Sequence, residues 1–244
     1  MTERPAQLPL PGLSVVVPAY NEETRIAATL QRIAEYVRPR LQELEIVVVD
    51  DGSDDATAEV ARAAVPDHTP VVVVRNGRNR GKGWSVRQGA LAARHPYVLL
   101  SDADLSTPIE ELDRLAALAT PKTVVIASRG MRGSTLEVRQ PLYRETMGRT
   151  FNLIVQGLLL PGIHDSQCGF KLFGREVVDA VFPILATERF AFDVEILARA
   201  TRMGFDVREV PVKWRNDDRS RVRAVRDSAV MLRDVLRIWW RLRG

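Results

Sequence analysis

Short runs of apolar, mostly β-branched residues alternate in the first half of the chain with segments in which apolar residues recur every three or four positions. Five of the short runs lie at residues 13–17, 45–49, 71–74, 97–100 and 123–127. Runs of this length are typical of parallel strands that are buried on both faces. The segments between them predict helices at residues 26–37, 57–64, 84–94 and 109–119. This alternation predicts an α/β fold, with an open, doubly wound, mostly parallel sheet flanked by helices.

The last of these helices has a clear start signal. Thr107 would be its N-cap, Pro108 its first residue and Glu110 the acid of a capping box. Beyond residue 128 the pattern is less regular. It predicts a long helix around residues 143–160, a glycine-rich turn near Cys168, a helix at 192–203 and a strand at 207–214.

These elements suggest three parts of the chain. Residues 1–12 form a proline-rich lead, residues 13–215 a single domain, and residues 216–244 a basic C-terminal helix. Within the domain, residues 13–128 have the pattern of a nucleotide-binding half. Residues 129–215 would form the half that receives a second substrate.

Polar clusters follow the predicted strands, and ligands of doubly wound sheets bind at the carboxyl ends of the strands. One cluster is acidic, because Asp50 and Asp51 come directly after the second strand. A carboxylate at such a position can accept hydrogen bonds from a nucleotide base or a ribose hydroxyl. The alternative is an acidic turn in which Asp54 or Asp55 caps the next helix, but a cap would account for one acid only.

Asp102 and Asp104 follow the fourth strand at a spacing of two residues. In an extended backbone both carboxylates would project to the same side. Such a pair suits Mg²⁺ or Mn²⁺, which complete their coordination with waters and substrate phosphates. The alternative is a turn that only caps a helix; Thr107 already fills that cap and leaves both acids without a structural task.

Residues 75–83 combine four cations with three glycines ahead of a helix. This composition suits a phosphate group, although the spacing is not that of a P-loop or of a dinucleotide-binding fingerprint. A solvated basic turn is the alternative. The three clusters together describe a site for a nucleoside diphosphate bridged by a divalent cation.

The residues of these clusters closely resemble glycosyltransferase family 2. The matching runs are VVPAYNEE at residues 16–23, VDDGS at 49–53, NRGKG at 79–83 and DADL at 102–105. Further runs resemble the dolichyl- or polyprenyl-phosphate sugar transferases, and the glucosyl members more than the mannosyl ones: SRG at 128–130, DSQCGFKLF at 165–173 and ERFAFDVE at 188–195. Mannosyl members generally carry Gln two residues after the second metal acid, where this chain has Ser106.

The resemblance implies the GT-A fold, a nucleotide-sugar donor, inversion at the anomeric carbon and a bound Mg²⁺ or Mn²⁺. It implies donor contacts at Pro18, Ala19, Tyr20, Glu22, Asp50 or Asp51, Lys82, Asp102 and Ala103. The implied metal ligands are Asp102 and Asp104. The implied acceptor contacts are Arg129, Arg144 and Lys171.

A lipid-phosphate acceptor is already anionic, so the cations of the second half would only need to hold and orient it, Arg129 foremost. A hydroxyl acceptor would need a general base, for which Asp193 is the first candidate and Asp165 the second. We expect transfer of a hexose, glucose first, from UDP-glucose to a polyprenyl or dolichyl phosphate. GDP-mannose as donor, a soluble hydroxyl acceptor, or a sugar-nucleotide-binding protein without turnover are the alternatives.

The net charge of +4 is unevenly distributed. Residues 219–244 carry eight arginines and two aspartates, a balance of +6, which leaves −2 for the rest of the chain. Apolar residues recur in this segment at helical spacing, namely at Val222, Val225, Ala229, Leu232, Leu236 and Trp239. They predict an amphipathic helix that lies on an anionic membrane surface, or one that packs on the body of the protein.

The remaining features concern location and partners. The start of the chain lacks the apolar run of a signal peptide, no stretch is long enough to span a bilayer, and Cys168 is the single cysteine. We expect a cytoplasmic protein, peripheral on the inner face of the membrane. Nucleic acid is not an expected partner, since no nucleic-acid-binding motif accompanies the arginines. Cys168 is expected to be packed and unreactive, and the pattern is silent on oligomeric state.

Overall fold

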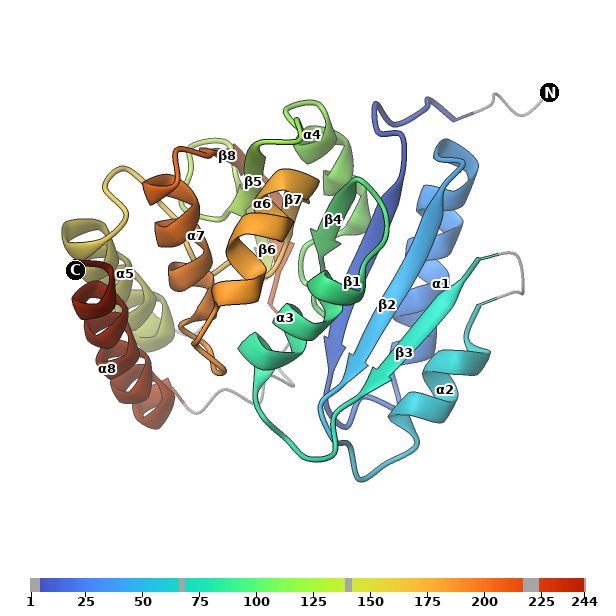
Figure 1. The fold of residues 1–244 in the computed structure, drawn as a ribbon, viewed down its shortest axis with the longest axis horizontal. Coiled ribbons are helices and arrows are strands. Elements are labelled where there is room, and N and C mark those ends of the chain that lie inside the picture. Colours follow the sequence, from blue (N-terminus) through green and yellow to red (C-terminus); the bar gives the residue numbers. More distant parts are fainter. Residues whose placement is uncertain (1–4, 66–68, 139–141, 217–223, 244) are drawn as a thin grey trace.

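The computed structural model describes residues 5–65, 69–138, 142–216 and 224–243. Its centre is a seven-stranded sheet in the order β3-β2-β1-β4-β7-β5-β8, with helices on both faces (Figure 1). The strands of this sheet are β1 (Leu13–Ala19), β2 (Leu44–Asp50), β3 (Val71–Arg75), β4 (Tyr97–Leu100), β5 (Thr123–Ser128), β7 (Lys171–Gly174) and β8 (Asp206–Pro211). All pairings are parallel except those of β7, which is antiparallel to β4 and β5. A separate parallel pair joins β6 (Thr135–Val138) and β9 (Lys213–Arg215).

Helices cover the sheet in two layers. The helices are α1 (Ile26–Val37), α2 (Thr57–Ala63), α3 (Lys82–Ala92), α4 (Leu112–Ala116), α5 (Leu142–Leu158), α6 (Arg175–Val181), α7 (Phe192–Arg202) and α8 (Ala224–Arg243), with 3₁₀ turns η1 (Arg38–Arg40), η2 (Ile109–Glu111) and η3 (Phe182–Ile184). Residues of α1, α2 and α4 share one hydrophobic cluster, and residues of α3, α5, α6, α7 and α8 share the other. In β1, Val15 and Val17 belong to the first cluster and Val16 to the second, as the alternation of side chains along a strand requires. The predicted doubly wound, mostly parallel sheet is confirmed.

Strand β7 is the strand of the central sheet that the sequence pattern missed; β6 and α6 were not predicted either. It begins at Lys171, which is fully buried, and follows a turn that contains Gly169. A lysine at a core position and glycines beside it break the apolar pattern by which the other strands were recognised. The insertion of β7 between β4 and β5 brings the second half of the chain into the middle of the sheet.

The expected start of the helix at 109–119 is wrong. The structure has the short turn η2 and then α4, which ends at Ala116. Thr107 is buried, and its hydroxyl lies 3.6 Å from the Sγ of Cys168 instead of capping the helix. Cys168 is buried as expected, and burial raises the pKa of its thiol, so it is not a reactive thiolate.

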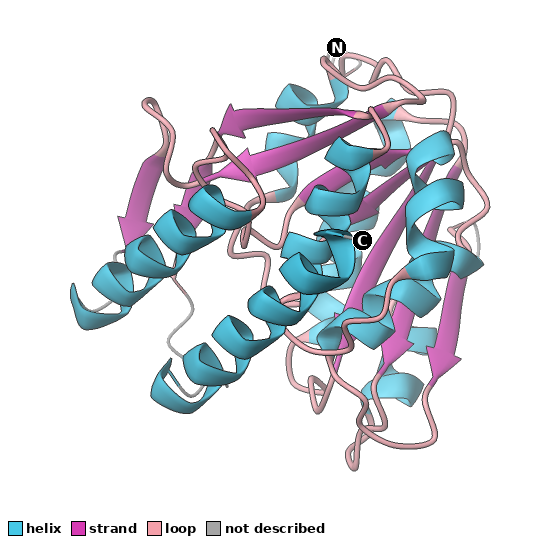
Figure 2. Cartoon of the chain, turned by 60° about the vertical axis from the view of Figure 1, so that its left-hand side comes forward, coloured by secondary structure: helices cyan, strands magenta, loops and turns pink. Residues whose placement is uncertain are grey.

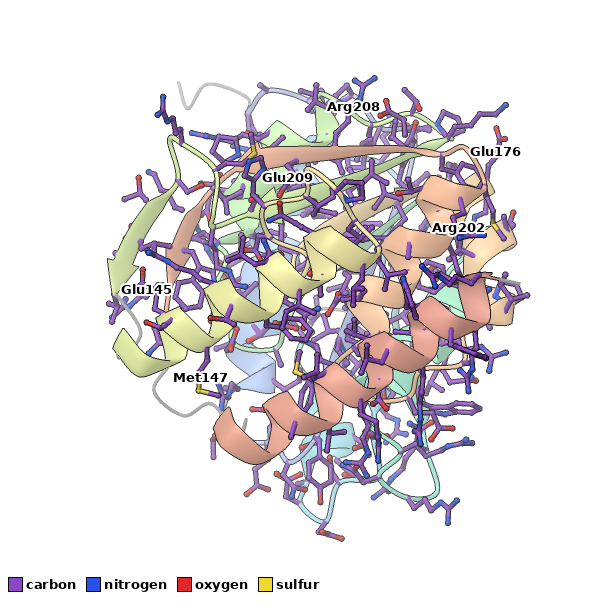
Figure 3. The ribbon with its side chains drawn as sticks, turned by 90° about the vertical axis from the view of Figure 1, so that its left-hand side faces the viewer. Glu145, Met147, Glu176, Arg202, Arg208 and Glu209 are labelled. Carbon is purple, nitrogen blue, oxygen red and sulfur yellow. The ribbon has the colours of Figure 1, made fainter. Side chains whose placement is uncertain are left out.

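Helix α8 packs along α5 and α7 (Figure 2), and Figure 3 shows α5 and α8 side by side across one face. Val235 and Ile238 are buried in the second hydrophobic cluster, so packing on the body is confirmed for this side of α8. Leu236, a member of the expected stripe, is 47% exposed and therefore does not pack on the body. The side chains at 222 and 225 lie outside the described residues. Among the described residues, no helix combines the length and the apolar character that crossing a membrane requires.

Candidate functional site

The carboxyl ends of β1, β2, β3 and β4 meet at one edge of the sheet, because these strands are neighbours and parallel. Backbone hydrogen bonds continue past the strand ends: Asp51 N donates to Ala19 O at 2.8 Å and Asn76 N to Asp50 O at 2.8 Å. The predicted polar clusters therefore lie on adjacent loops. Pro18, Ala19, Tyr20 and Glu22 are at the end of β1, beside the acidic turn after β2.

Asp51 holds the glycine-rich loop in place. Its Oδ1 accepts hydrogen bonds from Asn76 Nδ2 at 2.8 Å and from Arg80 N at 3.0 Å, and its Oδ2 accepts one from Gly81 N at 2.7 Å. The carboxylate is buried. The backbone N–H groups of Arg80 and Gly81, which could have bound a phosphate, thus donate to Asp51. These two amides are therefore not open to a phosphate, and phosphate binding by this loop stays a prediction.

Asp50 is also held within the protein. It is fully buried, its Oδ1 accepts a hydrogen bond from Ser53 N at 2.9 Å, and its Oδ2 lies 3.1 Å from Arg75 Nε. Asp55 serves the next helix, because its Oδ1 accepts the N–H of Thr57 at 3.0 Å. A donor contact at Asp50 or Asp51 would require an exchange of these internal bonds, and it stays a prediction.

Asp102 and Asp104 are more open. The side chain of Asp102 is 32% exposed, and Asp104 is exposed. The pKa of Asp104 is raised by partial desolvation of its carboxyl and by the negative charge of Asp102, and water on its exposed side limits the effect. Leu105, next in sequence, has a φ of 48°, a conformation that costs a side chain such as leucine about 1–3 kcal/mol. Ser106 N donates to Asp104 Oδ1 at 2.8 Å and stabilises this turn.

Gly169 makes room for the carboxylate of Asp102. A Cβ added at Gly169 would lie 2.1 Å from Asp102 Oδ2, so any other residue at 169 would force the Asp102 carboxylate to shift. On the other side of the loop, Thr29 Oγ1 donates to the carbonyl of Ala103 at 2.6 Å. The position of Asp102 is therefore set by α1 and by the turn that leads into β7.

Lys82 is the cation that faces Asp102. Its Nζ lies 2.5 Å from Asp102 Oδ1. Burial would lower the pKa of Lys82, but the carboxylates of Asp102 and Asp193 outweigh burial and raise it. Lys82 is the first residue of α3 and follows Gly81, whose φ is 107°. Lys82 is therefore a permanent positive charge at the metal-type acids.

The two acids fit a divalent cation that is shared with a substrate. The described residues contain no group of three or more His, Cys, Asp or Glu that could hold a metal alone. Mg²⁺ usually takes one or two carboxylates and completes its shell with waters and substrate phosphates. Two hard oxygen ligands at one turn, with the Asp102 carboxylate accommodated against Gly169, fit that mode.

Asp193 and Lys171 form a buried ion pair. Lys171 is fully buried, its Nζ bonds to Asp193 Oδ1, and it also donates to Cys168 O at 2.7 Å. Burial raises the pKa of Asp193, while Lys171 and Lys82 act against that rise. A direct contact between Lys171 and an acceptor would require this pair to open, and it stays a prediction. In the structure Lys171 holds Asp193.

Arg129 and Asp165 form a second pair, at the end of β5. Arg129 Nε and Nη2 donate to the two oxygens of Asp165 at 2.6 and 2.9 Å, and Arg129 N donates to Oδ2 at 2.9 Å. Burial alone would raise the pKa of Asp165, but the guanidinium of Arg129 more than offsets burial and lowers it. Asp165 is therefore a weak base. The side chain of Arg129 is 28% exposed and lies over the ring of Trp214.

Asp102 joins these groups into one charged cluster. Its carboxylate acts on the pKa of Lys82 and Asp104 from the first half of the chain, and on those of Arg129 and Asp193 from the second. We call this set the Asp102 cluster: Lys82, Asp102, Asp104, Arg129, Asp165, Lys171 and Asp193. Arg144 lies in α5, but its side chain is outside the described residues.

Comparison with known proteins agrees with this geometry. The family model described as "Glycosyl transferase family 2" matches residues 14–182. The chain belongs to glycosyltransferase family 2. It is 34% identical to "Dolichyl-phosphate beta-glucosyltransferase" of Dictyostelium discoideum, over 94% of this chain and 74% of that protein. The protein of the same name from Saccharomyces cerevisiae is 33% identical, over 92% and 73% of the two chains. That from Homo sapiens is 34% identical, over 84% and 68%.

Among solved structures, this glycosyltransferase is similar to glucosyl-3-phosphoglycerate synthase from Mycobacterium tuberculosis in complex with Mn²⁺, UDP-glucose and phosphoglyceric acid. The TM-score is 0.68 at 21% identity, over 93% of this chain and 78% of that one. The complex of that synthase with UDP gives a TM-score of 0.65 at 20% identity, with the same coverage. These likenesses confirm the GT-A fold.

Several residues that shape the site of this glycosyltransferase were missed at the sequence level. Glu209 accepts hydrogen bonds from Asp165 N at 3.0 Å and His164 N at 2.7 Å, and it is labelled in Figure 3. Glu188 bonds to Arg80, which lies 3.3 Å over the ring of Trp84. The contacts of Glu209 and Glu188 join segments far apart in sequence, so local spacing held no signal for them. Glu188 lies in the run at residues 188–195 that resembles the family, and this resemblance was the available signal for it.

Proposed function

We propose that the protein transfers glucose from UDP-glucose to a polyprenyl or dolichyl phosphate, with inversion at the anomeric carbon and with Mg²⁺ or Mn²⁺ bound. The Asp102 cluster carries the proposal, because it combines a metal-type acid pair with cations from both halves of the chain. The names of the relatives support glucose as the sugar and a lipid phosphate as the acceptor.

On the donor side, Asp102 and Asp104 would hold the cation between the protein and the diphosphate. The bound cation supplies Lewis-acid stabilisation of the charge that develops on the leaving nucleoside diphosphate. Lys82, beside the same acids, adds a fixed positive charge toward the diphosphate. Its permanent protonation means that it stabilises negative charge and does not act as a base.

On the acceptor side, Arg129 offers a guanidinium that is fixed by Asp165 and partly open to solvent. A phosphate held there needs orientation and no proton removal, because it is anionic at neutral pH. A hydroxyl acceptor would instead need a base. The lowered pKa of Asp165 makes it the poorer choice, and the raised pKa of Asp193 makes it the better one.

A donor and acceptor panel tests the proposal. UDP-glucose, UDP-GlcNAc, UDP-galactose and GDP-mannose are each incubated with polyprenyl phosphate and with Mg²⁺ or Mn²⁺, and transfer to the lipid is measured by chromatography. We expect transfer from UDP-glucose, and loss of transfer with EDTA. Transfer from GDP-mannose alone would overturn the choice of donor. Transfer only to a soluble hydroxyl acceptor would overturn the choice of lipid phosphate.

The second part of the proposal concerns an anionic membrane surface, where a lipid acceptor would lie. Helix α8 buries Val235 and Ile238 and exposes Trp240, which is 75% exposed, and Leu236. Arginines on its outer side are exposed at 233, 237, 241 and 243. Asp234 pairs with the first two and leaves the last two to meet lipid phosphates. An apolar edge flanked by arginines is the pattern of a helix that rests on an anionic bilayer.

Cosedimentation with vesicles of anionic and neutral lipid tests this surface. We expect the native chain to bind anionic vesicles and Trp240→Glu with Leu236→Glu to bind them at least about fivefold more weakly. The control is Leu91→Glu, which changes a leucine of similar exposure on α3. Equal binding by all three chains would overturn a role for α8.

A further inference from the structure

The ammonium of Lys82 lies against Oδ1 of Asp102, an oxygen that is buried in the structure. Nζ and Oδ1 are 2.5 Å apart, and the lysine side chain is 27% exposed. The backbone of Lys82 has little freedom to move away. A Cβ at Gly81 would lie 2.6 Å from Glu188 O, and one at Gly83 would lie 2.5 Å from Thr187 O. Both flanking glycines are thus pressed against the loop that precedes α7.

The charges of this part of the cluster nearly balance without any ligand. Lys82 faces two carboxylates, those of Asp102 and Asp104, and a third, Asp193, already has Lys171 as its partner. A divalent cation at Asp102 would therefore be placed beside this ammonium, whose one ion pair among the described residues is with Asp102. Like charges at a few ångströms repel strongly where water is partly excluded.

We propose that Lys82 is an internal counterion of Asp102. It weakens metal binding at Asp102 until a diphosphate binds and pairs with the ammonium instead. The proposal rests on the proposed function only in taking Asp102 and Asp104 as the metal ligands. A bound diphosphate would supply negatively charged oxygens for both the divalent cation and the ammonium of Lys82. Metal and diphosphate then strengthen each other's binding, and by linkage the factor is the same in both directions.

This role differs from a simple phosphate contact. A lysine that only binds phosphate would leave the affinity for the metal alone unchanged when its charge is removed. A counterion opposes the metal in the absence of nucleotide. Its removal must therefore raise the affinity for the metal alone and reduce the gain that the nucleotide brings.

The test is a titration of the full chain with Mn²⁺, in which free Mn²⁺ is followed by electron paramagnetic resonance, with and without UDP. We expect Lys82→Met to bind Mn²⁺ alone at least about tenfold more tightly than the native chain. UDP should raise the Mn²⁺ affinity of the native chain at least about tenfold more than that of the variant. Lys82→Arg, which keeps the charge, should behave like the native chain.

The matched control is Arg78→Met, which removes an exposed cation of the same loop. We expect its Mn²⁺ affinity to stay within about twofold of the native value, because exposed charges are screened. Lys82→Gln is the second variant if Lys82→Met does not give a native melting curve.

Unchanged or weaker Mn²⁺ binding by the uncharged variants would overturn the counterion proposal, whatever the transfer assay shows. So would a failure of both chains to bind Mn²⁺. A tighter Mn²⁺ site in a chain that transfers no glucose would uphold the counterion and overturn the proposed function instead.

Discussion

Two acidic pairs lie at the same edge of the sheet, one after β2 and one after β4, and the protein uses them differently. Asp50 and Asp51 are buried, and the oxygens of Asp51 accept two backbone amides and a side-chain amide of the protein. Asp102 and Asp104 are more open and face each other and Lys82. Carboxylates that already have internal donors stabilise a loop. Carboxylates that face a lysine side chain at a partly exposed site remain able to exchange partners with a ligand.

The largest expected effect tests the open pair. Asp102→Asn removes a charge that the cation and Lys82 both need, and we expect transfer to fall about 10²–10³-fold. The melting temperature should stay close to the native value, since the side chain is partly exposed. Asp54→Asn, an exposed acid beside the buried pair, is the control for activity. Activity within twofold of native in the Asp102 variant would place the metal elsewhere.

The next prediction concerns whether Asp193 is structural, like Asp51, or functional, like Asp102. Asp193 is buried like Asp51, but it faces a cation like Asp102. Lys171→Met leaves the carboxylate without its partner, and we expect a loss of about 3 kcal/mol in the free energy of unfolding. Urea denaturation measures this loss. Adding Asp193→Asn to the same chain should restore much of the stability, because the buried charge is then gone.

The turnover of the double variant then decides the role of the pair. If the double variant regains stability but shows no transfer activity, Asp193 has a functional role as well as a structural one. Full activity in the double variant would remove Asp193 and Lys171 from the reaction. A double variant that is as unstable as the two single losses added together would show that the two side chains are not coupled.

Substitutions in the buried pair, Asp50 and Asp51, should lower the stability of the fold and not the rate of transfer. Asp51→Asn replaces an acceptor by an amide group that cannot accept from Arg80 N and Gly81 N together, and we expect a loss of about 2 kcal/mol in unfolding free energy. Urea denaturation measures it, with Asp54→Asn again as the control. If the variant is as stable as the native chain but fails to bind UDP, Asp51 is a donor contact after all.

The smallest expected effect is a dependence on pH. The pKa of Asp165 is lowered from its ordinary value of 3.8 by Arg129, so this pair stabilises the fold above about pH 4 and the contribution is lost as the pH falls further. In Asp165→Asn the drop in unfolding free energy between pH 7 and pH 3 should be smaller by about 1 kcal/mol. Asp206→Asn, which breaks the exposed pair with Arg208, should leave the drop unchanged. An identical drop in native chain and Asp165 variant would contradict the lowered pKa.

The sheet could be predicted well, and the reason lies in its parallel strands. Strands covered on both faces are apolar throughout, so β1 to β5 stand out as continuous runs. Strand β7 could not be recognised because its first residue is the buried Lys171, whose partner Asp193 lies 22 positions away. The capping box at Thr107 failed for a similar reason, since Thr107 contacts Cys168 across 61 positions.

Helix α8 was half predictable. Its helical spacing and its arginines are local properties, and both were recognised. Which of its sides is buried depends on α5 and α7. That is why the expected stripe included the exposed Leu236 and did not include the buried Val235 and Ile238. An amphipathic pattern with apolar residues on more than one side does not contain this information.

The sequence by itself determined which chemical groups gather at the edge of the sheet, because strand order in a doubly wound fold brings successive strand ends together. Only the tertiary structure decided what each group does there. It turned Asp51 inward to the amides of its neighbouring loop, placed Gly169 against Asp102, and set Lys82 on the same carboxylate. Partner choice depends on distances between loops that are remote in sequence, and a buried charge takes whichever partner the packing brings within reach.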